Sequence, residues 1–148
     1  MEFAKEKNIP ARRFSKKTFS QTDEVLEYLF DKDIDFVALA GFLLLVPQNL
    51  IDAFPKRMTN IHPALLPNYG GKGMYGNNVH EAVAKNKDNE SGMTIHFVNE
   101  KYDDGNMIFQ AQCQLNPADT TKDIAAKVLT LEHHFYPQVL NGVVRKMA

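Results

Sequence analysis

The chain has 148 residues, the usual length of a single domain, and 44% of them are hydrophobic and 24% charged. Its 17 Lys and Arg nearly balance its 18 Asp and Glu, which argues against a general nucleic-acid binder with a basic face. The longest apolar run, residues 36–47, is well short of the roughly 20 residues that cross a bilayer. The lone Cys113 cannot form an internal disulfide, and the N-terminus lacks a signal-peptide pattern, so we expect a cytoplasmic protein.

Strand-like and helix-like segments alternate along the chain, which predicts an α/β fold. Residues 1–8 resemble the last turns of a helix. Ser20 and Asp23 form a capping-box-like start for a helix over about 22–32. The segment 35–42 is apolar on both faces, which is typical of an interior parallel strand covered by helices.

The remaining chain continues this alternation and adds an antiparallel strand pair. We expect helices at about 48–54, 78–86 and 121–146, strands at about 58–61, 93–98 and 107–115, and a long loop at 62–76. Pro137 predicts a kink or break in the last helix. The segment Gly70-Gly-Lys-Gly73 lacks the context of a phosphate-binding loop, so we interpret it as a flexible lid.

Asn60 and His62 form the first candidate site. Side chains two positions apart in an extended segment share a face, and Pro63 favours an extended His62. The pair would lie at the C-terminal end of a strand, where open α/β sheets bind ligands. From residue types alone, a capped strand end with a structural histidine is the more common interpretation.

The segment Asp103-Asp104-Gly105 is the second candidate site. Asp-Gly is a common turn pair, so a structural turn is the simpler interpretation when this segment is taken alone. The histidines and Cys113 show no metal-ligand spacing, and no metal site is predicted.

Taken together, these segments resemble successive motifs of the folate-dependent formyltransferases, and within them the glycinamide ribonucleotide formyltransferases. The motifs are Asn60-Ile-His-Pro-Ala-Leu-Leu-Pro67, Gly92-Met-Thr-Ile-His-Phe-Val98, Asp103-x-Gly105 with Gln110, and Glu132-His-x-x-Tyr-Pro137. The resemblance runs from about residue 9 to residue 140. It implies one Rossmann-like formyltransferase domain over 1–148, with a mostly parallel sheet, flanking helices and an antiparallel strand pair toward the C-terminus.

The resemblance implies that the protein transfers a formyl group from 10-formyltetrahydrofolate to the amine of glycinamide ribonucleotide in purine biosynthesis, without a metal. The implied catalytic residues are Asn60, His62 and Asp103. Asn60 and a protonated His62 would stabilise the oxyanion, and Asp103 would serve the proton relay.

Binding residues are implied in the same way. The folate contacts would be Leu43, Leu44, Leu45, Val46, Asn60, Asn99, Glu100, Lys101, Tyr102 and Asp103, and the nucleotide contacts would be Leu129 and Glu132. Without the resemblance, Leu43–Val46 are equally well the apolar end of a core strand, and Glu132 is a solvated helix residue.

The sequence departs from the family in three places. Many relatives carry an arginine at the position of Leu44, and the loop 68–77 is longer here, so we expect altered folate affinity and lid behaviour. The family also opens with a glycine-rich turn that binds the substrate phosphate at a helix N-terminus, and no such turn occurs here. We therefore expect that the chain lacks roughly one βαβ unit, ~30 residues or more. Either a second copy or a separate fragment would then cover an open sheet edge, or the segment 36–39 would be abnormally exposed.

Two alternatives stay open. One is a 10-formyltetrahydrofolate hydrolase, in which water replaces the amine, although the motif at Glu132 counts against it. The other is a non-catalytic folate-binding fragment that keeps Asn60, His62 and Asp103 but cannot hold the phosphorylated substrate. In each case the expected partners are small molecules, with no nucleic acid and no membrane.

Overall fold

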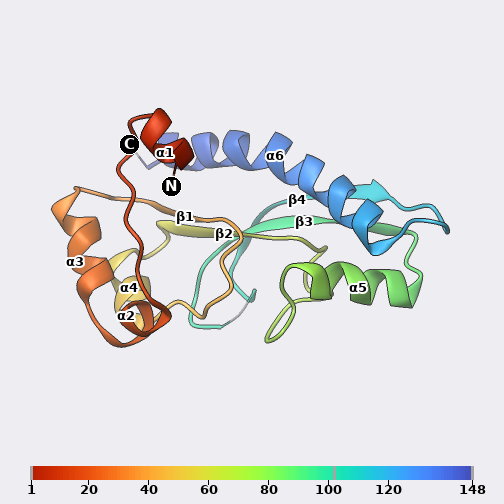
Figure 1. Ribbon diagram of the computed structural model, residues 1–148, viewed down its shortest axis with the longest axis horizontal. Helices are drawn as coiled ribbons and strands as arrows, with labels where there is room; N and C mark the ends of the chain where they lie inside the picture. The colour runs from red at the N-terminus through yellow and green to blue at the C-terminus, as the bar shows by residue number, and fades with distance from the viewer. Residues whose placement is uncertain (1, 102, 148) are drawn as a thin grey trace. The chain divides into compact units, whose positions relative to one another are not determined.

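The protein is described from a computed structural model that places residues 2–101 and 103–147 (Figure 1). The chain divides into two compact units, Met1–Ile34 and Asp35–Ala148. Each unit is described by itself below.

The first unit consists of helices. They are α1 (Glu2–Glu6), α2 (Lys16–Gln21) and α3 (Glu24–Asp31). Ser15 caps α2, where its side chain accepts a hydrogen bond from the Thr18 amide at 3.0 Å. The predicted helix start at Ser20 is wrong, because Ser20 lies inside α2 and its hydroxyl donates to the Lys16 carbonyl at 2.6 Å. The extended backbone of Thr22 ends α2 and separates it from α3.

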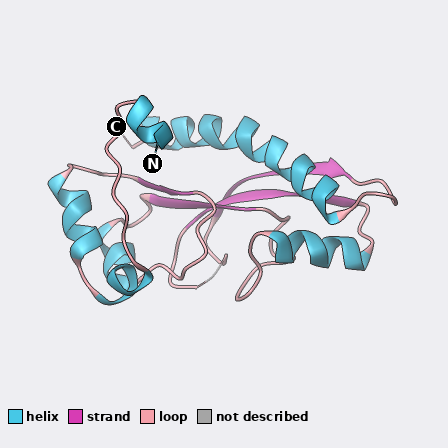
Figure 2. Cartoon of the chain, in the orientation of Figure 1, coloured by secondary structure: helices cyan, strands magenta, loops and turns pink. Residues whose placement is uncertain are grey.

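The second unit contains a four-stranded sheet and the remaining helices (Figure 2). The strands are β1 (Val37–Leu39), β2 (Met58–His62), β3 (Glu90–Phe97) and β4 (Met107–Gln114), and the helices are α4 (Gln48–Ala53), α5 (Asn77–Asn86) and α6 (Thr121–Arg145). Their spatial order is β1-β2-β3-β4. The α/β class and the antiparallel pair β3–β4 are confirmed.

Two details of the predicted sheet need correction. Among the described residues the sheet is mixed rather than mostly parallel, because β1–β2 is parallel whereas β3 runs antiparallel to β2 despite the helix between them. The predicted interior strand 35–42 is shorter. Its regular part is β1, which ends at Leu39, and Gly41 soon turns the chain with a φ of +60°. In the described part of the chain, β1 lies at the end of the strand order.

Helices α5 and α6 pack on each other, and α6 also lies along β3 and β4 (Figure 1). The buried core between these elements is made of Ile61, Val83, Met93, Ile95, Ile124, Val128 and Tyr136. At its start, α6 has the capping box in which Thr120 and Asp123 exchange hydrogen bonds. The helix continues through Pro137 to Arg145 without the predicted break. Among the described residues, no helix combines the length and apolar character that crossing a bilayer requires.

Thr94 fastens the segment that follows β2 onto the sheet. Its buried hydroxyl donates to the Ala64 carbonyl at 2.7 Å and accepts hydrogen bonds from the Leu66 amide at 3.1 Å and from Gln110 Nε2 at 2.8 Å. Gln110 Nε2 also donates to the Leu66 carbonyl at 3.1 Å. This network holds the chain just beyond His62 in one place.

We expect Thr94→Val to lower the free energy of unfolding by about 2–3 kcal/mol, because several buried groups lose a hydrogen-bond partner while side-chain volume is conserved. Chemical denaturation measures the difference. The matched control is Thr130→Val, at an exposed position of α6, where we expect a change within about 0.5 kcal/mol. Equal losses of unfolding free energy in both variants would contradict the role of Thr94 in holding this segment on the sheet.

Candidate active site

One face of the central strands carries polar side chains. In the antiparallel pair β2–β3, Asn60 lies opposite His96 and His62 lies opposite Thr94. Side chains opposite one another share a face, and so do residues two apart along a strand. The intervening Ile61 belongs to the apolar core. Both His62 and His96 are only 3% exposed, so this polar face is closed off from bulk water at the two imidazoles.

Asp103 reaches this polar face from the loop between β3 and β4. Its Oδ1 lies 3.4 Å from His62 Nδ1 and 3.5 Å from His96 Nε2, and its side chain is 9% exposed. The Gly71 amide donates to Asp103 Oδ2 at 3.1 Å. The structure therefore brings His62 and Asp103 together, and the adjacent His96 contacts the third predicted catalytic residue, Asn60, at 3.4 Å.

Glycines allow the close approaches at this site. A Cβ at Gly105 would lie 1.6 Å from the Phe97 carbonyl oxygen and 3.3 Å from His96 Nδ1, so the position has no room for a side chain. Asp103 itself has a φ of +52°, a left-handed conformation that Asp tolerates better than most residues. The Asp-x-Gly segment thus serves close packing against His96 as well as the turn.

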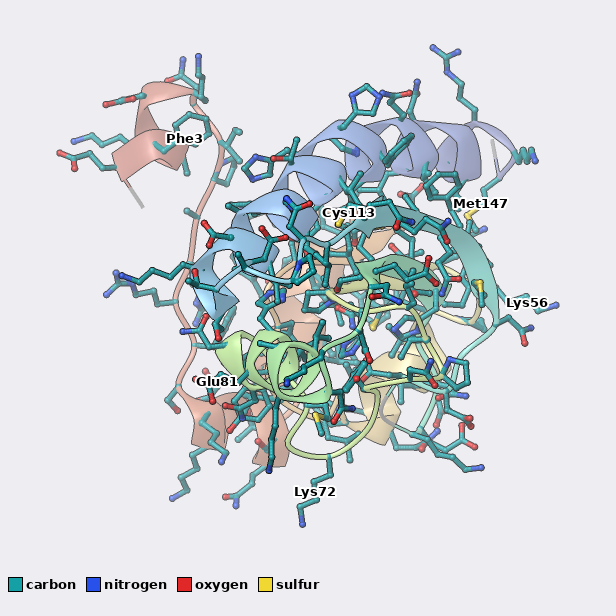
Figure 3. The ribbon with its side chains drawn as sticks, turned by 90° about the vertical axis from the view of Figure 1, so that its right-hand side faces the viewer. Phe3, Lys56, Lys72, Glu81, Cys113 and Met147 are labelled. Carbon is teal, nitrogen blue, oxygen red and sulfur yellow. The ribbon has the colours of Figure 1, made fainter. Side chains whose placement is uncertain are left out.

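The glycine-rich loop contributes its backbone rather than its lysine. Lys72 is exposed and extends away from the sheet (Figure 3). The neighbouring Gly71 amide points at the Asp103 carboxylate. A lid movement of this loop stays a prediction.

Backbone carbonyls fix the proton positions of both histidines. His62 Nε2 lies 2.7 Å from the Tyr69 carbonyl oxygen, and His96 Nδ1 lies 2.8 Å from the Phe97 carbonyl oxygen. A carbonyl oxygen only accepts, so each of these ring nitrogens carries a proton. The other nitrogens, His62 Nδ1 and His96 Nε2, face the Asp103 carboxylate. Asp103 therefore stands between two ring nitrogens that are proton-free whenever the rings are neutral.

The surroundings lower the pKa values of His62, Asp103 and His80. Burial lowers the pKa of His62 below 6.5, although Asp103 and the Tyr69 carbonyl oppose the shift. Burial raises the pKa of Asp103, but the hydrogen bond from His96, the His62 charge and the Gly71 amide outweigh it, so the pKa lies below 3.8. His80 on α5 is also buried, and burial and the nearby His62 lower its pKa.

These shifts make the folded protein sensitive to acid. The unfolded chain binds more protons than the folded one between the lowered pKa of His62 and 6.5, so the stability from neutral His62 is fully present above pH 6.5 and is lost as the pH falls below it. Asp103 acts in the same sense at lower pH, because its folded-state pKa is also depressed.

The remaining predicted site residues lie in three places. Leu43–Val46 follow the C-terminal end of β1, on the side of the sheet where the parallel β2 also ends. Asn99, Glu100 and Lys101 precede Asp103 in its loop, and Tyr102 lies outside the described residues. Leu129 and Glu132 lie one turn apart on α6.

Two of these groups carry features that suit ligand contact. Leu43 and Leu45 are about half exposed, at 51% and 45%, despite being apolar. Burial raises the pKa of Glu132. Within the described part of the chain, no hydrogen bond joins Leu129 or Glu132 to Asn60, His62 or Asp103.

Sequence reasoning missed three residues of the site. His96, Thr94 and Tyr69 all contact the polar face or the residues on it. The alternation of polar and apolar residues in 93–98 contained a signal, since it places Thr94 and His96 on one face. Among the residues that the structure describes, no group of three or more His, Cys, Asp and Glu side chains has the arrangement of a metal site.

Comparison with known proteins identifies the family of the chain. The model of the formyl transferase family matches residues 1–140. The chain belongs to this family. It is 44% identical over 147 residues to a chloroplastic phosphoribosylglycinamide formyltransferase of Arabidopsis thaliana, covering 96% of this chain and 50% of that relative. With the phosphoribosylglycinamide formyltransferase of Bacillus subtilis the identity is 30%, over 97% of this chain and 73% of the relative.

Solved structures agree with this assignment. A phosphoribosylglycinamide formyltransferase from Bacillus halodurans superposes with a TM-score of 0.88 at 33% identity, covering 99% of this formyl transferase chain and 75% of that chain. A formyltetrahydrofolate deformylase from Pseudomonas syringae has a TM-score of 0.81 at 20% identity, which shows a shared fold alone. The chain spans about half the length of the plant relatives, so its activity and substrates are proposals.

Asp103 is expected to raise the pKa of His62, and its removal provides a test. We expect the pKa of His62 in Asp103→Asn to lie lower than in the unaltered chain, because burial then acts without the opposing carboxylate. Histidine NMR titration measures this value.

The matched control for this titration is Asp104→Asn. Asp104 is exposed and lies 3.6 Å from Lys101 Nζ rather than beside a histidine, so the pKa of His62 should not change. An unchanged or raised His62 pKa in Asp103→Asn would show that the two groups are not coupled.

Proposed function

We propose that the protein transfers the formyl group of 10-formyltetrahydrofolate to the amine of glycinamide ribonucleotide, a step of purine biosynthesis. The observation that carries the proposal is the buried contact of Asp103 with His62, beside Asn60 on one sheet face. Membership in the formyl transferase family and the names of the relatives support this reaction.

Charge develops on one oxygen atom during the proposed reaction. When the amine attacks the formyl carbon, the carbonyl oxygen becomes an oxyanion, which N–H donors stabilise. Asn60 supplies an amide donor from the end of β2. Both ring nitrogens of His62 face protein groups, Nε2 the Tyr69 carbonyl and Nδ1 the Asp103 carboxylate. His62 can therefore supply a second donor only when its Nε2–H also donates to the oxyanion or no longer donates to the Tyr69 carbonyl.

Proton transfer completes the reaction without a covalent enzyme intermediate. The attacking nitrogen must lose one proton and the departing folate nitrogen must gain one, so protons balance over the cycle. His62 and Asp103 are a suitable relay, because Asp103 Oδ1 lies 3.4 Å from His62 Nδ1 and both side chains are buried.

We assign the binding roles from the same proposal. The pterin would contact Leu43–Val46 and the loop 99–103, where half-exposed leucines offer an apolar surface. Glu132, with Leu129 one turn away, would accept hydrogen bonds from the ribose hydroxyls. We further propose that both compact units belong to one formyltransferase domain of a cytoplasmic protein, since one family model covers residues from both.

An assay of the chain with both substrates tests this proposal. Transfer of the formyl group to glycinamide ribonucleotide and release of formate are measured in parallel. We expect transfer to exceed formate release. Formate release that does not depend on the nucleotide would instead support the hydrolase, and binding of the folate with neither product would support a non-catalytic fragment.

The catalytic assignment makes a kinetic prediction. Alanine at Asn60, His62 or Asp103 should lower kcat by about 10²-fold or more while KM for the folate changes much less, because the lost interactions act mainly in the transition state. Steady-state kinetics measures both constants.

Asp104→Ala, at the exposed neighbour of Asp103, is the control and should retain the kcat of the unaltered protein. A near-normal kcat in His62→Ala would remove His62 from the mechanism.

A further inference from the structure

We propose that His96 is a positioning residue for the formyl transfer, and that its imidazole holds the Asn60 side chain in the orientation in which the donor Nδ2 faces the site. This inference rests on the proposed function. It concerns the cross-strand pair Asn60–His96.

The first step is the fixed tautomer of His96. Its Nδ1 donates to the Phe97 carbonyl at 2.8 Å, so Nε2 of the neutral ring has a lone pair and no proton. The ring is buried, and the backbone at Gly105 packs against Nδ1, with no room there for even a Cβ. The ring is therefore held with Nε2 toward Asn60 and Asp103.

The second step is the amide that faces this nitrogen. Asn60 Nδ2 lies 3.4 Å from His96 Nε2, and it donates to the proton-free nitrogen of the neutral ring. Within the described residues, the buried Asn60 Oδ1 has no hydrogen-bond partner. An unpaired buried acceptor is unfavourable, yet the reversed amide would place Oδ1 against another acceptor. His96 thus stabilises the orientation in which Nδ2 is held and its second N–H is available to an oxyanion.

The third step is the position of Asp103. Its Oδ1 lies 3.5 Å from His96 Nε2 and 3.4 Å from His62 Nδ1, so the ring nitrogen that faces Asn60 also borders the carboxylate beside His62. His96 therefore links the orientation of the Asn60 amide to the contact between Asp103 and His62.

The kinetic test compares two replacements of His96. His96→Leu removes the acceptor and should lower kcat about 10-fold or more, with KM for the folate changed less than about 2-fold, because one oriented donor contributes roughly 10²- to 10³-fold. His96→Gln offers a carbonyl oxygen to Asn60 Nδ2 and should recover most of kcat. The control, His134→Gln, lies on the exposed face of α6 and should leave kcat unchanged.

A double substitution separates positioning from independent catalysis. Because His96 acts through Asn60, the double variant His96→Leu, Asn60→Ala should have the same kcat as Asn60→Ala alone. The inference would be overturned if the fold-loss of kcat in the double variant were the product of the two single losses. A normal kcat in His96→Leu would overturn it as well.

A measurement without substrate keeps the inference separate from the proposed reaction. Nitrogen-15 NMR of the unaltered chain should find neutral His96 protonated at Nδ1, the nitrogen that faces the Phe97 carbonyl. A neutral His96 protonated at Nε2 would overturn the inference even if formyl transfer is observed. The expected tautomer together with no formyl transfer would instead refute only the proposed function.

Discussion

The site depends on one contact, the approach of Asp103 Oδ1 to His62 Nδ1 and His96 Nε2 at 3.4 and 3.5 Å. Three features of the fold permit this contact. The register of β2 and β3 places the two histidines on one face. The absence of a side chain at Gly105 lets the loop pack against the Phe97 carbonyl, and the Gly71 amide occupies the other carboxylate oxygen. The polar face is therefore assembled from segments that are distant in the sequence.

Burial of this contact shifts the pKa values of its groups and also carries a free-energy penalty. A carboxylate removed from water is unfavourable unless charges or hydrogen bonds compensate it, and here they outweigh burial, so the pKa of Asp103 falls. Burial of His62 lowers its pKa in the same cluster. The two groups proposed to relay protons are thus also groups that make the folded state sensitive to acid.

Much of the site could be predicted from local sequence. Spacing by two residues and the following proline place Asn60 and His62 side by side, and the structure shows both at the end of β2. The role of His96 could not be predicted in this way, because it depends on which β2 residue lies opposite it, and a register between strands is a long-range property. The hydrogen bonds that the Tyr69 carbonyl and the Gly71 amide make with His62 and Asp103 could not be predicted either, since backbone groups form them and neither depends on the type of side chain.

The fold shows a similar division. The alternation of elements predicted the α/β class, and the helix predicted at about 121–146 matches α6, Thr121–Arg145. The direction of β3 was not predictable from the helix that precedes it. The strand β1 ends at Leu39, shortly before the left-handed Gly41, although the apolar pattern continues further. Hydrophobic periodicity identifies which residues face the core, whereas strand direction and element ends depend on pairing and on single backbone conformations.

The most direct test of the central contact is a double-mutant cycle between His62 and Asp103, read in kcat for formyl transfer. Groups that act as one catalytic unit lose nearly the same activity when either or both are removed. We expect His62→Ala, Asp103→Ala and the double variant to share nearly the same kcat. A double variant whose loss is the product of the two single losses would show that the two residues act independently, and would contradict a site built on their contact.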